Sequence, residues 1–128
     1  MVGIVSSRRV RGTPFSAGVE AAGAQAYTVY NHMLLPSYFE SYTADYRHLK
    51  EHVQVWDVAV ERQVSIKGPH ALRLMKRMSA RDMNRMANDQ CYYVPICDHK
   101  GGMLNDPVAL KLADDHYWLS IADGDLLQ

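Results

Sequence analysis

The feature that most constrains the fold is a run of three strand-forming segments separated by short turn signals. Residues 91–97, 103–112 and 117–121 are rich in aromatic, β-branched and other apolar side chains. Residues 98–102 join the first pair of segments and residues 113–115 join the second pair. Connections this short make neighbouring strands antiparallel, because a parallel crossover needs a dozen or more residues. The pattern therefore predicts an antiparallel β-meander.

Further helices and strands are predicted upstream of this meander from capping residues and apolar spacing. Thr13 followed by Pro14 is typical of a helix start, and Ser37 with Glu40 three residues later matches a capping box. The predicted helices span residues 13–22, 37–52 and 71–78, and the predicted strands span residues 26–30, 53–58 and 63–67. The expected fold class is therefore α+β, with helices flanking the meander.

The two ends of the chain lead to expectations about domain organisation. Residues 1–12 are rich in Gly, Ser and Arg and show no periodicity, so we expect a flexible N-terminus. Ala122 and Asp123 are typical of a helix start, yet the sequence stops at Gln128. We therefore expect residues 13–128 to be the N-terminal part of a domain that is truncated at its C-terminal end. Missing strands would leave open sheet edges, which favours self-association.

The charge balance narrows the classes of partner that the chain can bind. Fourteen Lys and Arg residues balance fourteen Asp and Glu residues, so the net charge is zero. Nucleic-acid and anionic-membrane partners need a basic excess, and neither partner is expected here. No apolar run approaches the roughly 18 residues of a membrane helix. The N-terminus has no apolar core of a secretory signal, and we expect a cytoplasmic protein.

One short motif has the spacing of a zinc site. His48, Glu51 and His52 match the H-x-x-E-H pattern, and the two histidines would face the same way on a helix. A third ligand is not evident, and Arg47 and Lys50 make the helix face cationic. We therefore predict a solvated helix face and no metal site.

Two other features suggest a binding site for a small molecule. Eight Tyr and two Trp outnumber two Phe, and rings with a polar tip suit flat heterocycles and cationic ligands. His32 ends a predicted strand, where polar groups often point into sites. Asp106 follows Asn105 inside an otherwise apolar segment and precedes Pro107. Burying a carboxylate there is costly, so Asp106 lies at a strand edge or serves a function, and both alternatives stay open.

Four stretches of the sequence occur in a characteristic order and spacing. They are Val55-Trp56-Asp57-Val58, Val64 to Pro69, Gln90 to Tyr93, and Gly101-Gly102-Met103-Leu104-Asn105-Asp106. Together they resemble the glycine cleavage T-protein family of tetrahydrofolate-dependent aminomethyl- and methyltransferases. The resemblance runs from about residue 13 to the end of the chain.

A second set of stretches resembles one subgroup of that family, which demethylates dimethylsulfoniopropionate by methyl transfer from sulfonium to tetrahydrofolate. These stretches are Tyr27 to Pro36, Asp45 to Leu49, Val53 to Val64, Cys91 to Pro95, and Asn105-Asp106-Pro107-Val108. T-proteins typically have Ser-His-Met where this chain has Ala59-Val60-Glu61, and Asp-Asp where it has Asn105-Asp106. The alternatives are a T-protein aminomethyltransferase and a non-catalytic folate-binding regulatory or assembly protein.

The resemblance implies roles for particular residues. Asp106 matches the family's catalytic aspartate at the folate site. Tyr93 matches a folate-contacting tyrosine, and Asn105 is expected to bind the cofactor beside it. Tyr30, His32 and Met33 match the end of the site that binds the substrate. The implied cofactor is tetrahydrofolate, and the implied partner is a small-molecule methyl donor. Family members fold as three domains around a central folate channel, and this chain would form part of the first.

Overall fold

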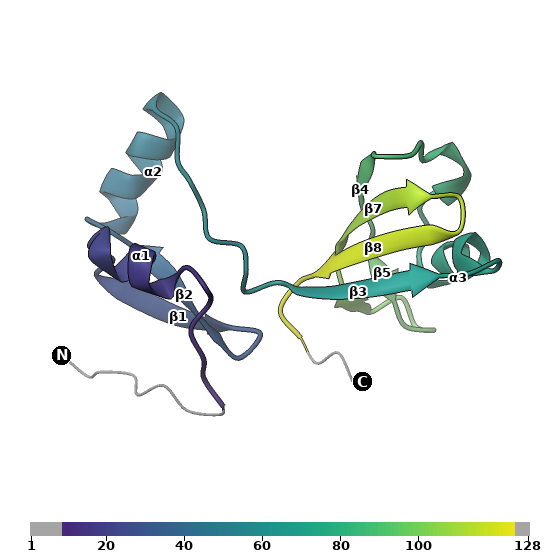
Figure 1. Cartoon of the computed structure of the whole chain (residues 1–128), viewed down its shortest axis with the longest axis horizontal. Helices are drawn as coiled ribbons and strands as arrows, with labels where there is room; N and C mark the ends of the chain where they lie inside the picture. Colours follow the sequence, from purple (N-terminus) through teal and green to yellow (C-terminus); the bar gives the residue numbers. More distant parts are fainter. Residues whose placement is uncertain (1–8, 125–128) are drawn as a thin grey trace. The chain divides into compact units, whose positions relative to one another are not determined.

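The computed structural model describes residues 9–124, and the chain divides into two compact units, Met1–Val60 and Glu61–Gln128. Figure 1 labels the elements of each unit.

The first unit is built around a β-hairpin with a helix on either side in the sequence. Its elements are α1 (Ser16–Ala21), β1 (Ala26–Tyr30), β2 (Met33–Tyr38) and α2 (Tyr42–Glu51). Asn31 and His32 form the two-residue turn, with φ angles of 48° and 63°. Positive φ at both positions matches the right-handed twist of the flanking strands. Arg11 extends this hairpin through a parallel bridge to Met33, while residues 1–8 of the expected flexible N-terminus lie outside the described part.

The predicted helix start at Ser37 is wrong, because residues 37 and 38 belong to strand β2. The helix cap is Ser41, whose hydroxyl accepts a hydrogen bond from the Ala44 amide at 3.1 Å. The Asp45 carboxylate also accepts from the Phe39 amide at 2.7 Å. Pro36 does not end β2, since a strand that pairs on one side only can accommodate a residue without an N–H.

The predicted strand at 53–58 is also wrong. These residues follow α2, and no strand of the described residues pairs with them. Side chains hold the segment instead: the Gln54 amide donates to the Asp45 carbonyl at 2.8 Å, and the Thr13 hydroxyl donates to the Asp57 carboxylate. Val55 is 96% exposed. Alternating hydrophobicity indicates an extended backbone, but a strand also needs a neighbour for its backbone hydrogen bonds.

The second unit contains a four-stranded antiparallel sheet with the strand order β3-β8-β7-β4 (Figure 1). Its strands and helices are β3 (Arg62–Lys67), α3 (Ala71–Met78), the single 3₁₀ turn η1 (Met83–Arg85), β4 (Cys91–Tyr93), β5 (Ile96–Cys97), β6 (Met103–Asn105), β7 (Val108–Ala113) and β8 (His116–Ile121). The sequence predictions of β3, α3 and the β7–β8 connection are confirmed. Strands β4, β7 and β8 form the predicted meander, and β3 extends it beside β8.

One face of this sheet carries the hydrophobic core of the unit. Side chains from α3, the η1 turn and the sheet are buried together: Ala71, Met75, Met83, Met86, Val94, Ala109, Tyr117, Leu119 and Ile121. The cross-strand pairs Tyr92–Ala109, Ala109–Leu119 and Leu119–Val64 continue this face across all four strands. Since side chains alternate along a strand, the residues between them point to the other face.

Two predicted strands are each broken into two. The segment 91–97 divides into β4 and β5 at Val94 and Pro95, and the segment 103–112 divides into β6 and β7 at Asp106 and Pro107. A proline has no N–H to donate to a strand ladder, so each break contains one. The Val94 amide donates to the Pro107 carbonyl at 2.9 Å, which keeps the two breaks side by side.

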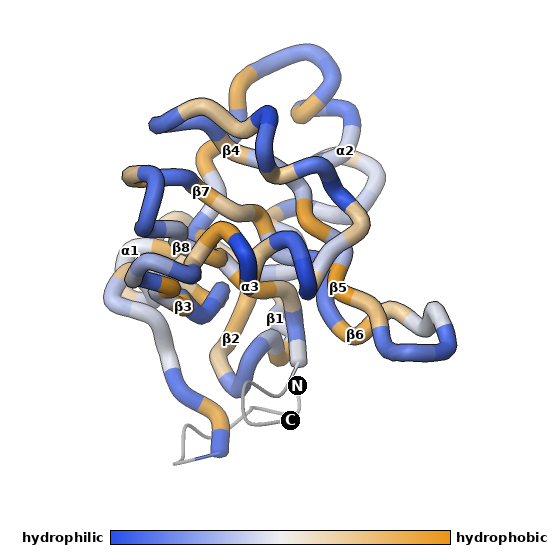
Figure 2. The backbone as a smooth tube through the Cα atoms, turned by 90° about the vertical axis from the view of Figure 1, so that its right-hand side faces the viewer, coloured by the Kyte–Doolittle hydropathy of each residue, from blue (hydrophilic) through white to orange (hydrophobic). Residues whose placement is uncertain are grey.

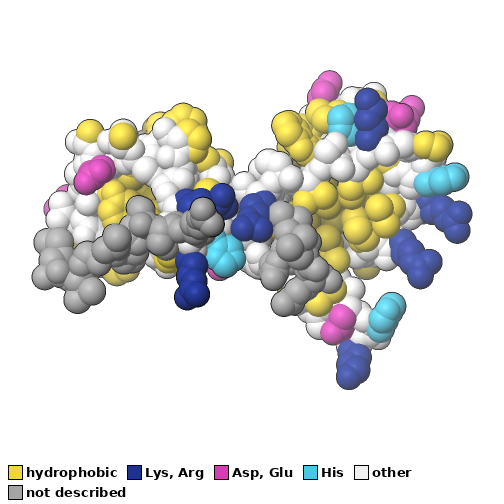
Figure 3. All heavy atoms as spheres, turned by 60° about the horizontal axis from the view of Figure 1, so that its bottom comes forward, with side chains coloured by type: hydrophobic (Ala, Val, Ile, Leu, Met, Phe, Trp, Pro, Cys, Tyr) yellow, Lys and Arg dark blue, Asp and Glu magenta, His cyan; other side chains and the backbone are white. Residues whose placement is uncertain are grey.

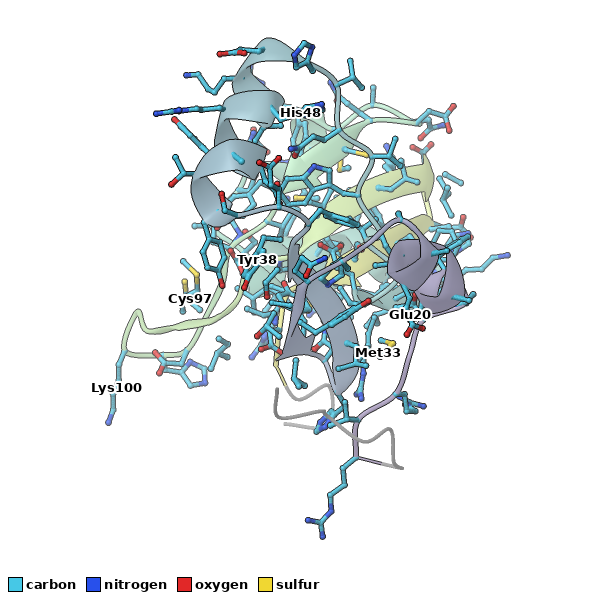
Figure 4. All side chains as sticks on the ribbon, turned by 90° about the vertical axis from the view of Figure 1, so that its left-hand side faces the viewer. Glu20, Met33, Tyr38, His48, Cys97 and Lys100 are labelled. Carbon is cyan, nitrogen blue, oxygen red and sulfur yellow. The ribbon has the colours of Figure 1, made fainter. Side chains whose placement is uncertain are left out.

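Beyond the breaks, β5 and β6 form a separate hairpin. Its tip is hydrophilic (Figure 2) and includes Lys100 (Figure 4). The turn at 98–102 is the predicted one, and the Asp98 carboxylate accepts from the amides of Lys100 and Gly102 at 2.8 Å each. The body of the helix predicted to begin at Ala122 lies outside the described residues, which end at Gly124.

Candidate functional site

The two strand breaks bring together two of the three residues expected at the folate site. Tyr93 is the last residue of β4, and Asp106 lies in the break between β6 and β7. The Tyr93 hydroxyl donates a hydrogen bond to Oδ2 of Asp106 at 2.8 Å. The Tyr93 side chain is half exposed, while Asp106 is partly buried. Asp106 thus lies outside both strands and has a specific hydrogen-bond partner, while its role at the folate site stays a prediction.

The hydrogen bond to Asp106 favours the protonated form of the phenol. Hydrogen bonding to Asp106 raises the pKa of Tyr93, and partial desolvation and the negative charge of Asp106 raise it further. The phenol thus remains a donor at neutral pH, and it holds one oxygen of the carboxylate. Among the described residues, Oδ1 of Asp106 has no hydrogen-bond partner. A ligand amine beside Tyr93 could therefore meet an oriented carboxylate oxygen.

The sheet face beside this pair is opposite to the one that carries the core. Register places four side chains in one row across the sheet: Tyr93, Val108, Ser120 and Gln63. A second row contains Cys91, Leu110, Trp118 and Ser65. Val108 and Trp118 are each more than 40% exposed. The face therefore offers aromatic and aliphatic surface next to a carboxylate, a combination that suits a flat heterocycle with a polar edge.

Glu61 is a polar residue of this face that sequence reasoning did not assign to a site. Its Oε2 accepts a hydrogen bond from the Ser120 hydroxyl, which in turn accepts from the Gln63 amide at 2.7 Å. The sequence signal that could have indicated Glu61 is its position, because T-proteins typically have a methionine there. The contact with Ser120 joins residues 59 positions apart, so only the folded sheet reveals it.

The side chain of Asn105 has a structural partner. Its Oδ1 accepts from the Ala122 amide at 3.1 Å, and its Nδ2 donates to the Ala122 carbonyl at 3.2 Å. This paired contact ties the start of the Asp106 break to the end of β8. Direct binding of a cofactor by Asn105 stays a prediction.

The expected substrate residues lie together at one end of the first unit. Tyr30 and Met33 flank the hairpin turn as a cross-strand pair, and Met33 is labelled in Figure 4. His32 is exposed in the turn, and its carbonyl accepts from the Arg11 amide at 2.9 Å. Tyr93, Asn105 and Asp106 belong to the second unit, so the structure brings the predicted residues together as two separate groups.

The first unit also contains a hollow of about 620 Å³ that was not predicted. Strand β2, helix α2 and the segment after α2 line it, mainly with apolar and aromatic side chains. Tyr38 and Tyr42 meet there edge to face, with ring centroids 4.7 Å apart. Tyr42, Tyr46 and Leu49 recur at three- and four-residue spacing on α2 and form one apolar helix face, which is exposed rather than buried.

The histidines of the zinc-like motif lie at the C-terminal end of helix α2. The rings of His48 and His52 lie on one helix face with centroids 4.8 Å apart, and His48 is labelled in Figure 4. Within residues 9–124, no three His, Cys, Asp or Glu side chains are grouped as metal ligands would be. Over the same residues, every helix is too short or too polar to span a membrane.

Comparisons with known proteins give consistent results. The family described as GCVT N-terminal domain matches residues 15–126. The chain is 77% identical over all 128 residues to dimethylsulfoniopropionate demethylase DmdA of Ruegeria pomeroyi, of which it covers 35%. It is 30% identical over 87 residues to an aminomethyltransferase of Lysinibacillus sphaericus. These 87 residues are 68% of this chain and 24% of the relative.

A solved structure shares the fold. It is glycine cleavage system aminomethyltransferase T from Bartonella henselae, with a TM-score of 0.72 and 19% sequence identity. The likeness covers 89% of this chain and 31% of the other. The chain thus spans about a third of the length of the relatives it matches. With the family match extending over most of its length, this chain belongs to the GCVT N-terminal domain family.

Proposed function

We propose that the full-length protein transfers a methyl group from the sulfonium of dimethylsulfoniopropionate to tetrahydrofolate. The observation that carries the proposal is the 77% identity, over all 128 residues, to a demethylase of that substrate. The small-molecule donor and the cytoplasmic location predicted from the sequence belong to the same proposal.

The residues around Tyr93 fit a folate. Its half-exposed ring and the apolar row beside it offer surface for a flat heterocycle, and the oriented Asp106 carboxylate offers an acceptor for an amine. When bound, tetrahydrofolate supplies the amine nitrogen that accepts the methyl group. The Asp106 carboxylate would face the positive charge that develops on that nitrogen, and the Tyr93 phenol would hold the carboxylate in place.

The proposed reaction needs no acid catalyst. The bond from the methyl carbon to sulfur breaks as the bond from that carbon to nitrogen forms. The electron pair of the broken bond stays on sulfur, which leaves as a neutral thioether, and the acceptor amine loses one proton. The protein's contributions are alignment of the two reactants and stabilisation of charge. In this proposal Tyr30, His32 and Met33 contact the donor, and the aromatic ring of Tyr30 attracts its sulfonium by about 0.5–2 kcal/mol.

The test is the reaction itself in the full-length protein. With dimethylsulfoniopropionate and tetrahydrofolate, we expect formation of 5-methyl-tetrahydrofolate. Asp106→Asn keeps the shape of the side chain but removes its charge, and we expect turnover to fall about 100-fold. Asp115→Asn is the matched control because it removes the same charge from an exposed turn, and its turnover should equal that of the unmodified protein. Normal turnover by Asp106→Asn would refute the role of this carboxylate.

The second candidate is aminomethyl transfer, which the 30% identity to an aminomethyltransferase favours. Its test offers an aminomethylated lipoyl carrier protein in place of the sulfonium. Release of ammonia together with methylene-tetrahydrofolate would select this reaction over demethylation. Folate binding without turnover of either donor would favour the non-catalytic alternative.

A further inference from the structure

The Asn105 side chain binds both backbone groups of the residue that follows β8. Its Oδ1 accepts from the Ala122 amide at 3.1 Å, and its Nδ2 donates to the Ala122 carbonyl at 3.2 Å. A paired strand makes the same exchange of N–H and carbonyl through its own backbone. Gly124 lies against the same side chain, because a Cβ at position 124 would come within 3.2 Å of Nδ2 of Asn105. The last residue of β6 is thereby fixed to the chain that leaves β8.

The break that contains Asp106 is held on both sides. Asn105 precedes it, and Pro107, which follows it, is fully buried and accepts a hydrogen bond at its carbonyl from the Val94 amide at 2.9 Å. Asp106 itself belongs to no strand of the described residues. The position of its carboxylate is therefore set by these two neighbours and by the hydrogen bond from Tyr93.

An amide matches the two backbone groups of Ala122. The Ala122 N–H requires an acceptor and the Ala122 carbonyl requires a donor, and an asparagine side chain supplies both. An ionised carboxylate of the same shape has no donor and would place an oxygen against the carbonyl oxygen. Both polar atoms of Asn105 are engaged in this contact, which favours a supporting role for Asn105 over direct binding of the cofactor.

We infer that Asn105 is a positioning residue that holds the Asp106 carboxylate where it can act on the folate. The inference rests on the proposed function, in which Asp106 faces the positive charge that develops on the acceptor amine. Electrostatic stabilisation of a transition state is most effective when the charged group is already in place, since moving the group during the reaction costs free energy. Asn105 thus acts through Asp106.

A double-mutant cycle in the full-length protein tests whether Asn105 acts through Asp106. We expect Asn105→Ala to lower kcat about tenfold, because it removes two hydrogen bonds that fix the neighbour of Asp106. The KM for tetrahydrofolate should change less than about threefold, since the Tyr93 ring and the apolar row beside it remain. With Asp106→Asn already present, Asn105→Ala should lower kcat by less than about twofold, because the charge to be positioned is gone.

A second measurement follows the Asp106 carboxylate without any substrate. The Tyr93 hydroxyl donates to Asp106, and the NMR signal of the phenol carbon Cζ is sensitive to such a hydrogen bond. In full-length protein made with isotope-labelled tyrosine, the Tyr93 signal is assigned by its absence in Tyr93→Phe. We expect the signal to move in Asn105→Ala toward its position in Asp106→Ala, where the hydrogen bond is lost.

Two further variants separate the contact from side-chain size. Asn105→Asp keeps the shape but loses the donor to the Ala122 carbonyl, so we expect kcat to fall and the Tyr93 signal to move as in Asn105→Ala. It also gives the same comparison if Asn105→Ala does not fold, as judged by circular dichroism. Asn84→Ala removes the same side chain from the exposed η1 turn and should leave kcat and the Tyr93 signal unchanged.

The outcomes distinguish this inference from the proposed function. An unmoved Tyr93 signal in Asn105→Ala would overturn the inference, even if the unmodified protein forms 5-methyl-tetrahydrofolate. An equal loss of kcat with and without Asp106→Asn would also overturn it, because Asn105 would then only maintain the fold. A moved signal in a protein without methyl transfer would support the positioning of Asp106 while refuting the proposed reaction.

Discussion

Tyr117 is fully buried in the second unit, and its hydroxyl has no hydrogen-bond partner among the described residues. A buried hydroxyl without a partner loses its hydration on folding and gains nothing in return. Tyr117→Phe should therefore raise the free energy of unfolding of the full-length protein by about 1 kcal/mol. Urea unfolding followed by far-UV circular dichroism measures the change.

The control for this variant is Tyr92→Phe. The Tyr92 hydroxyl donates to the Arg85 carbonyl at 3.2 Å, so its removal should cost stability by about 1 kcal/mol. The same chemical change is thus expected to have opposite signs at two positions. A loss of stability in both variants would show that Tyr117 has a partner in the full-length protein.

At the same scale, the sequence indicates Tyr93 and Asp106 as candidate folate residues but does not predict how these two side chains meet. Tyr93 and Asp106 are each recognisable from the family resemblance, and the charge of Asp106 in an apolar segment is unusual by itself. Their hydrogen bond joins two segments whose strand breaks lie side by side, and this arrangement is a consequence of tertiary packing. The contact of Glu61 with Ser120 depends on the pairing of β3 with β8, which local patterns do not determine.

Among the elements, the β1–β2 hairpin contains a residue in an unfavourable conformation. His32 has a φ of 63°, a region that costs a residue with a Cβ roughly 1–2 kcal/mol and glycine almost nothing. His32→Gly should thus raise the stability of the full-length protein by about 1 kcal/mol, seen as a higher Tm. The proposed contact of His32 with the donor would make the same variant less active.

Asn31→Gly is the matched variant of the neighbouring position. Asn31 also has a positive φ, yet its side chain is buried and donates to the Val60 carbonyl at 3.1 Å. Losing that contact should outweigh the conformational gain, so this variant should have a lower Tm. If His32→Gly also lowered the Tm, strain in the turn would not be the dominant effect.

The elements that the sequence predicts well have both ends marked by local signals. β1, β3 and α3 are bounded by such signals, and their positions agree closely with the structure. β2 is not predicted from local signals because Pro36, a residue that typically interrupts a strand, lies within it. The segment 53–58 has the alternation of a strand but is held by Gln54 and Asp57 through contacts with distant residues. Pairing partners of this kind lie far along the sequence and are not encoded in its local periodicity.

At the scale of the molecule, hydrophobic side chains are exposed on both units (Figure 3). Helix α2 has no buried residue, and the sheet of the second unit leaves Trp118 and Val108 exposed on one face. Surfaces of this kind are rarely left in contact with water. The 128-residue chain alone should therefore self-associate or unfold without a sharp transition. Light scattering during size-exclusion chromatography and a thermal melt measure this, and a clean monomer with a cooperative transition would contradict the prediction.

Both cysteines of the second unit are free and exposed, but only Cys91 lies on the same sheet face as Tyr93. Cys97 lies beyond the strand break, in the β5–β6 hairpin. The two cysteines therefore provide a probe and a control for a footprinting experiment. A folate that covers the face should slow alkylation of Cys91 by iodoacetamide and leave Cys97 as the internal standard, with peptide mass spectrometry as the readout. Equal protection of the two thiols would place the ligand elsewhere, and a selective effect would map occupancy without any mutation.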